Sequence, residues 1–202
     1  VCGLNGDKTR LVDIRSYPEN SRLIVDYTFD NSTPVNYGGP DITDGRTVTI
    51  TFQHSLIAMP EPGYAPRLDD QRVGYFSQRV TDLTDVSVTP WRDLIDRWRL
   101  IKKDPEADIS EPITPITFWL ENSTPVAYRD AIRNGVLAWN SAFETAGFRN
   151  AMVVNIQPDD AEWDAGDIRY KVIRWVSSPH PYYGGYGPRL PNPRTGEIIA
   201  AD

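Results

Sequence analysis

Hydrophobic and polar residues alternate along much of the first hundred residues, the period of a β-strand with one apolar face. The alternation is cleanest at the start of 47–59, where Thr, Gln and Ser residues share one face and the other face carries Val48, Ile50, Phe52, His54 and Leu56. The segments 10–18 and 21–30 are separated by a polar turn and predict a hairpin, and 72–80 predicts a further strand. We therefore predict an antiparallel, β-rich N-terminal domain over residues 1–111.

The period changes to that of a helix at Thr89. Thr89 is a favourable N-cap, and Pro90 suits the first helical position. Large apolar residues then follow at helical spacing, which predicts a helix at about 90–103; they are Trp91, Leu94, Ile95, Trp98 and Ile101. The polar stretch 104–112 is the best linker, so the domain boundary is predicted between 111 and 112.

The second half alternates strands with one long helical pattern. Strands are expected at 113–121, 151–156 and 167–176, and 197–202 begins another. Between the first two, "NSTP" predicts an N-terminus capped by Ser123 or Thr124 for a helix over 125–146. This order predicts the class α+β for the whole chain, with a second domain at 112–202 in which one crossover helix lies behind a twisted sheet.

Composition and charge exclude several classes of protein. The net charge of −7 and the isoelectric point of about 4.9 argue against a nucleic-acid partner. The sequence contains no apolar run long enough for a membrane span. The single cysteine excludes an internal disulfide and a cysteine-cluster zinc site.

Candidate metal ligands are few. A catalytic zinc site needs about three protein ligands, and the chain has only His54 and His180. We interpret His54 as a hydrogen-bonded core residue and His180 as a solvent-facing loop residue. The acidic loop 159–167 leaves calcium open as an alternative, although its spacing is not that of an EF-hand. We therefore expect no metal ligand, no cofactor and no catalytic residue in this chain.

A tyrosine-rich loop at 179–188 offers a different kind of function. Tyr182, Tyr183 and Tyr186 lie among glycines. Tyrosines on adaptable loops suit contacts with peptides or sugars. The alternative hypotheses are thus a non-catalytic peptide- or glycan-binding module, or a purely structural domain.

Long motifs of the second half resemble a family of large bacterial zinc metallopeptidases of metzincin-like type. The motifs are "GVLAWNSAFETAGF" and "DIRYKVIRWV", and the resemblance covers essentially all of 98–202. It extends more weakly through 52–77, which is similar to the domain of unknown function that precedes the protease in that family. The resemblance implies that 112–202 is the N-terminal part of a metzincin-like upper subdomain.

In such peptidases the order is strand, backing helix, strands, an edge strand that lines the cleft, and then the H-E-x-x-H helix. No H-E-x-x-H occurs in this chain. The resemblance therefore implies that zinc is bound by a longer parent protein and that this chain alone is inactive. It also implies a peptide or protein substrate and an exported parent, in the periplasm or at the cell surface.

The edge strand supplies the predicted substrate-binding residues. A strand edge can hold an extended peptide by main-chain pairing. The backbone of Ile198, Ile199, Ala200 and Ala201 is expected to face the substrate, with the side chains of Tyr186 and Arg189 beside it. This set is a hypothesis from topology.

Both ends of the chain are expected to be internal to a longer polypeptide. The chain begins at Val1, and "EIIAAD" at its end has the pattern of an unfinished strand. An unfinished edge strand exposes unpaired backbone groups, and a core that lacks its last helix exposes apolar side chains. We therefore expect self-association through these surfaces.

Overall fold

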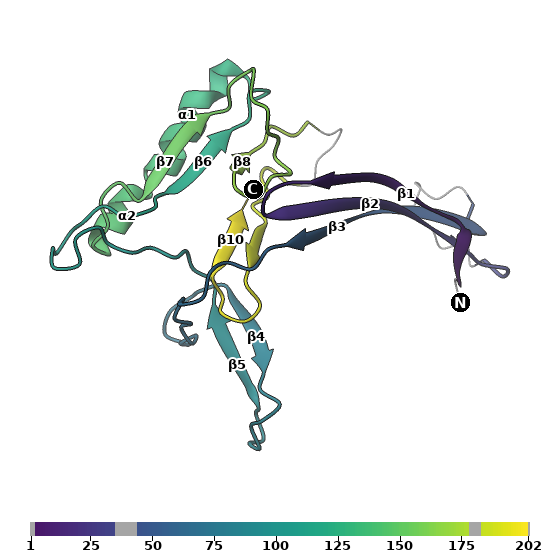
Figure 1. The fold of residues 1–202 in the computed structure, drawn as a ribbon, viewed down its shortest axis with the longest axis horizontal. Helices are drawn as coiled ribbons and strands as arrows, with labels where there is room; N and C mark the ends of the chain where they lie inside the picture. The colour runs from purple at the N-terminus through teal and green to yellow at the C-terminus, as the bar shows by residue number, and fades with distance from the viewer. Residues whose placement is uncertain (1–2, 35–43, 178–182, 202) are drawn as a thin grey trace. The chain divides into compact units, whose positions relative to one another are not determined.

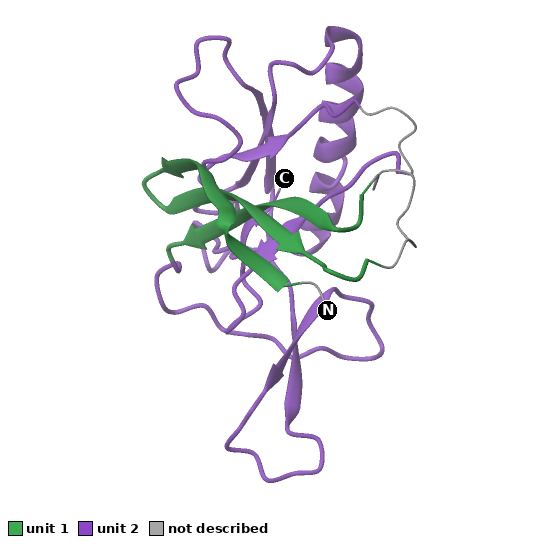
Figure 2. Ribbon diagram, turned by 90° about the vertical axis from the view of Figure 1, so that its right-hand side faces the viewer, with its two compact units in different colours: residues 1–58 green, residues 59–202 purple. Residues whose placement is uncertain are grey.

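The computed structural model describes residues 3–34, 44–177 and 183–201. The chain divides into two compact units, residues 1–58 and 59–202 (Figure 2). The predicted fold class is confirmed, since an antiparallel N-terminal sheet is followed by a parallel sheet with a helical segment. The predicted boundary between 111 and 112 lies inside the second unit, and separate folding of the two predicted domains stays a prediction.

Unit 1 is an antiparallel meander of three strands. β1 (Gly3–Ser16), β2 (Asn20–Asp30) and β3 (Thr47–Ile57) lie in the order β1-β2-β3 (Figure 1). The β2–β3 register is continuous, and irregularities interrupt β1 between Asn5 and Arg10 and between Leu11 and Asp13. The predicted hairpin and the strand after it are confirmed.

One face of this sheet is polar and joined by cross-strand hydrogen bonds. Asp26 on β2 accepts hydrogen bonds from Arg10 on β1 and Thr51 on β3, at 3.1 and 2.7 Å. Asp30 accepts hydrogen bonds from Asn5 at 2.6 Å, Thr47 at 2.8 Å and Lys8 at 3.0 Å. The two carboxylates therefore link all three strands.

This polar face makes unit 1 sensitive to acid. The hydrogen bonds from Asn5, Thr47 and Lys8 lower the pKa of Asp30 to about 2, from an ordinary value of about 3.9. A lowered pKa contributes stability that is present above pH ~4 and is lost as the pH falls through about 2. We expect Asp30→Asn to flatten the fall of the urea-unfolding midpoint between pH 5 and pH 2. A pH profile identical to that of the unmutated chain contradicts this.

The other face of the sheet is apolar and uncovered within unit 1. The alternation of β3 predicts a strand with one buried, apolar face, but β3 is exposed along almost its whole length, so that burial is wrong. His54 lies on this face and hydrogen-bonds the Tyr27 hydroxyl at 3.0 Å, as expected, but it is exposed and not a core residue. The reason is that the described residues of unit 1 form a single layer, with no second element to pack against it.

The first two strands of unit 2, β4 (Ser77–Thr81) and β5 (Trp91–Ile95), form an antiparallel hairpin. The predicted helix at 90–103 is therefore wrong. Its backbone groups are paired with distant segments instead: the N–H groups of Ile95, Asp96 and Arg97 donate to the carbonyls of residues 67, 76 and 196. Long-range pairing outweighs the local helical pattern.

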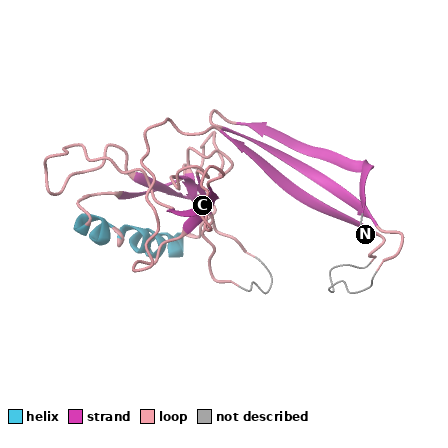
Figure 3. Cartoon of the chain, turned by 90° about the horizontal axis from the view of Figure 1, so that it is seen from below, coloured by secondary structure: helices cyan, strands magenta, loops and turns pink. Residues whose placement is uncertain are grey.

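The parallel sheet of unit 2 contains β6 (Ile116–Leu120), β7 (Met152–Ile156) and β8 (Lys171–Ile173), in the order β7-β6-β8. The helical segment, α1 (Val126–Leu137) and α2 (Asn140–Thr145), runs along one face of this sheet (Figures 1 and 3). The predicted order of strand, helix, strand and strand is confirmed, although β8 is much shorter than 167–176.

The start of α1 differs in detail from the prediction. Its N-cap residue is Pro125, and no side chain caps the helix. The capping by Ser123 or Thr124 is therefore wrong. The Ser123 hydroxyl instead donates to the Glu121 carboxylate at 2.6 Å, and Thr124 is buried.

The last strands form a small separate sheet. β9 (Arg189–Pro191) and β10 (Ile198–Ala201) are antiparallel and are connected by a turn that contains Gly196. The predicted final strand thus exists, but its hydrogen-bonded partner is β9 rather than the parallel sheet. The largest fully buried apolar side chains of unit 2 come from β5, β6 and β8: Ile95, Leu120 and Val172.

Candidate functional site

Two buried carboxylates join the β9–β10 hairpin to the segment that follows β5. The Asp96 side chain is 1% exposed and accepts hydrogen bonds from Arg189 Nε at 2.7 Å and Gln78 Nε2 at 3.3 Å. The Glu197 side chain is 8% exposed and accepts two hydrogen bonds from Arg99, at 2.6 and 2.9 Å. We call these four charged residues the polar seam.

The main chain reinforces the polar seam. Arg97 N–H donates to the Gly196 carbonyl at 3.0 Å, and Ile198 N–H donates to the Arg97 carbonyl at 2.9 Å. Gly196 has φ of +75°, and a β-carbon there would overlap the carbonyl oxygen of Ile95. The chain passes so close to β5 that only glycine fits without displacement.

The polar seam fixes several of the predicted substrate-binding residues. Arg189 is held by Asp96, and its guanidinium lies 4.1 Å from the centre of the Phe76 ring. The N–H of Ile198 already donates to the Arg97 carbonyl, so a peptide could pair only with the part of β10 that follows Ile198. Ala200 is buried, and Ile199 and Ala201 are half-buried. Tyr186 is 78% exposed.

The carboxylates of the polar seam are functional candidates that the sequence patterns do not predict. Asp96 and Glu197 each occupy an ordinary polar position of a local pattern, and their partners lie 93 and 98 residues away. One signal is present in the sequence. Within 91–101, charged residues lie on both sides of the apolar residues in the chain, a pattern that also fits an extended segment between two polar segments.

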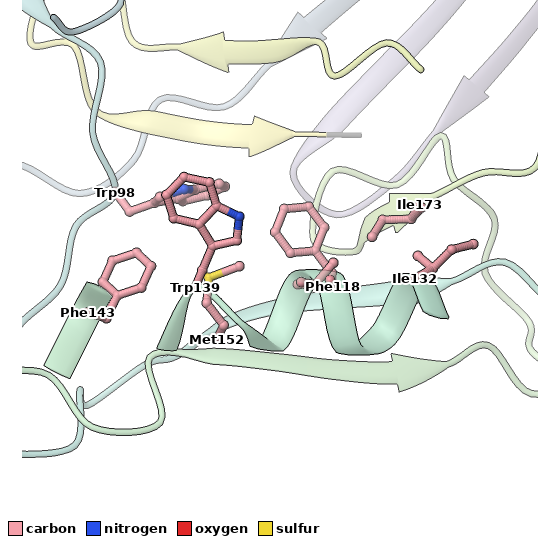
Figure 4. A pocket seen from close by; sticks show the side chains of 9 residues that line it. Trp98, Phe118, Ile132, Trp139, Phe143, Met152 and Ile173 are labelled. Carbon is pink, nitrogen blue, oxygen red and sulfur yellow. The ribbon is translucent and has the colours of Figure 1, made fainter. Parts of the chain in front are cut away.

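An apolar groove of about 550 Å³ opens between the helical segment and the parallel sheet (Figure 4). Trp98 lies beside it, 6.5 Å between ring centres from Phe118 on β6, and Lys171 Nζ lies 5.3 Å from the Trp98 ring. No residue of α1 or α2 is buried. The helical segment therefore covers the sheet only in part. The other lining residues are Ile132, Gly135, Val136, Trp139, Phe143, Met152 and Ile173.

The predicted metal alternatives find no support in the geometry. Within 3–34, 44–177 and 183–201, no three His, Cys, Asp or Glu residues are grouped so that they could hold a metal ion. In the acidic loop, Asp167 is buried and bonded to Arg169 at 2.6 Å, which lowers its pKa. His180 and Tyr182 lie outside the described residues.

None of the helices in the described part of the chain is long and apolar enough to cross a membrane. A family model described as a domain of unknown function, DUF5117, matches residues 2–103. No curated protein and no solved structure matches the chain.

Proposed function

We propose a function for a chain that belongs to the DUF5117 family: it forms the scaffold and one wall of the substrate cleft of a zinc-dependent metallopeptidase. By itself the chain is inactive, because the zinc ligands belong to a longer parent polypeptide. The family match covers 2–103 and supports the interpretation of this part as a domain of unknown function; its place before a protease is part of the proposal. The peptidase part of the proposal rests on the resemblance of 98–202.

The observation that carries the proposal is the uncovered apolar groove. A helix that packs on a sheet normally buries one continuous stripe of its residues. Here no residue of α1 or α2 is buried, and the aromatic side chains of Phe118 on β6 and of Trp98 line the open groove. In the parent, the zinc-binding helix would fill this groove and complete the core.

The order of elements gives further support. The chain passes from β6 through the helical segment to β7 and β8, and then through the short strand β9 to β10. The peptidase family has the same order, with the strand at the position of β10 as the edge of the cleft. The polar seam holds the beginning of β10 rigidly, so the backbone of Ile199, Ala200 and Ala201 is positioned to pair with an extended peptide.

Zinc, when bound in the parent, supplies a Lewis acid and an activated water molecule. The residues of this chain have a different task, which is to orient the substrate. Arg189 acts through Asp96 by fixing β9 beside β10. Tyr186 precedes β9, is 78% exposed, and is proposed to contact the peptide.

A charged residue in the groove tests the proposal. We expect Val136→Glu to change the free energy of unfolding of the 202-residue chain by less than about 1 kcal/mol, since the groove is open to solvent. In the parent the same change should lower kcat/KM for peptide cleavage at least about tenfold, because the carboxylate would be buried against the zinc helix. Asn134→Glu, on the exposed side of α1, is the matched control.

Zinc analysis tests the division of labour. The reading frame of the parent should continue to an H-E-x-x-H, and that protein should bind one zinc ion and cleave protein substrates. The 202-residue chain should do neither. One tightly bound zinc ion in the 202-residue chain, together with hydrolysis, would refute the proposal.

The exposure of Tyr186 favours a second candidate, a peptide- or glycan-binding module. In that case the 202-residue chain alone should bind a peptide or glycan array, and Tyr186→Ala should abolish binding while Tyr186→Phe retains the ring contact. The peptidase proposal predicts no binding until the cleft is complete. Export of the parent to the periplasm or cell surface is part of the peptidase proposal.

A further inference from the structure

The apolar face of the unit 1 sheet is large and continuous. The register places the odd residues of β2 from 23 to 29 in its centre, with their partners on β1 and β3 on either side. The outer strands contribute six apolar side chains that are 44 to 64% exposed: Leu4, Leu11, Ile14, Ile50, Phe52 and Leu56. We call this surface the apolar sheet face.

A sheet with one apolar face requires a second layer. Stable domains bury such a face against another sheet or a helix, and monomers rarely expose a continuous apolar patch of more than a few hundred Å². Among its described residues, unit 1 contains the three strands and their connections and no helix. The described residues of unit 1 therefore supply no second layer of their own.

The chemistry of the apolar sheet face suits a copy of itself. None of the positions that the register places on it is charged. Its central polar groups are already paired, since the Tyr27 hydroxyl hydrogen-bonds His54 at 3.0 Å. Two such faces can meet without burying an unpaired charge, whereas the opposite face carries Asp26, Asp30 and their cations and cannot.

The area is also sufficient. Strands of 11 residues are about 36 Å long, and three strands span about 10 to 14 Å across. Each face thus covers on the order of 400–500 Å² in projection, so two copies bury roughly 800–1,000 Å² in total, at the lower limit for a specific interface. Sheets that pack in this way lie about 10 Å apart with nearly aligned strands.

We propose that the apolar sheet face is the interface of a two-fold dimer, in which a second copy of this chain supplies the missing layer. The contact is isologous, because the same patch is used by both copies. The dimer strengthens as salt increases, since each copy carries a net charge of −7 and salt screens the repulsion.

Sedimentation velocity on the 202-residue chain tests the proposal with a matched pair of variants. The unmutated chain should be a dimer at about 50 μM. Phe52→Lys places a charge on the apolar sheet face and should weaken the dimer at least about 100-fold. Gln53→Lys makes a similar change at the next residue of β3, on the opposite face, and should leave the dimer intact. Far-UV circular dichroism should be used to check that both variants are folded.

A measurement on the unmutated chain covers the case in which Phe52→Lys does not fold. His54 is exposed on the apolar sheet face, so diethyl pyrocarbonate should modify it several-fold more slowly at dimer concentrations than after dilution to monomer. A modification rate independent of concentration overturns the proposal. So does a monomer at all concentrations, or a dimer lost in Ile199→Pro but kept in Phe52→Lys, which would place self-association at β10 instead.

Discussion

Replacement of Arg189 by methionine is expected to destabilise the chain by about 3 kcal/mol, because it leaves a buried carboxylate without its cation. The Asp96 side chain is 1% exposed, and within the described part of the chain Gln78 is the side chain that would still donate a hydrogen bond to it. Methionine keeps most of the apolar volume over Phe76, so the loss reports the charge rather than the packing. Urea unfolding followed by tryptophan fluorescence measures the effect.

The controls separate a structural role of Arg189 from a role in substrate contact. Arg194→Met removes an exposed arginine from the same hairpin and should change stability by less than about 0.5 kcal/mol. The double variant Arg189→Met/Asp96→Leu should recover much of the lost stability, since both members of the pair are then apolar. An Arg189→Met variant with unchanged stability but impaired peptide cleavage in the parent would assign Arg189 to the cleft.

Gly196→Ala is expected to be similarly harmful, at about 3 kcal/mol, from two additive causes. The left-handed backbone conformation, with φ of +75°, disfavours any residue with a β-carbon. The β-carbon would also overlap the carbonyl of Ile95, which belongs to the rigid backbone of β5 and cannot rotate away. The variant should lower the urea midpoint and weaken the Arg97 pairing with the turn.

Substitutions at two other glycines separate the backbone strain from the overlap with Ile95. Gly63 has φ of +101°, but a β-carbon at this position would meet no neighbour within 4 Å, so Gly63→Ala measures the backbone strain alone. Gly135 lies in α1 with equal space around it, and Gly135→Ala should stabilise the helix by up to about 1 kcal/mol. Equal losses for Gly196→Ala and Gly63→Ala would show that the close approach to Ile95 is unimportant.

The strands of unit 1 and the helical segment of unit 2 could be predicted because their signals are local. Alternation over 47–59 depends only on neighbouring residues, and the pairing of β2 with β3 preserves it. The helix over 125–146 is likewise a property of one continuous stretch, with Gly147 at its end in a positive-φ conformation. Local patterns therefore predict the structure wherever no distant segment competes for the backbone.

The segment 90–103 shows why such patterns fail. Its apolar residues fit a helix by spacing, but Leu94 and Ile95 are adjacent and both buried, which an extended strand between two layers also allows. The competing partners, residues 67, 76 and 196, lie far away in sequence. The polar seam could not be predicted for the same reason, since no local window contains both Arg99 and Glu197.

The polar seam has a consequence for how the chain is made. Arg99 leaves the ribosome 98 residues before its partner Glu197, a delay of about 5–20 s at ordinary rates of synthesis. Closure of so long a loop is entropically slow and depends on contacts that form last. The stretch after β5, although it belongs to the family-matched region, therefore reaches its final conformation only after the hairpin near residue 197 has been translated, and nascent chains halted before that point should be preferred targets of chaperones and proteases.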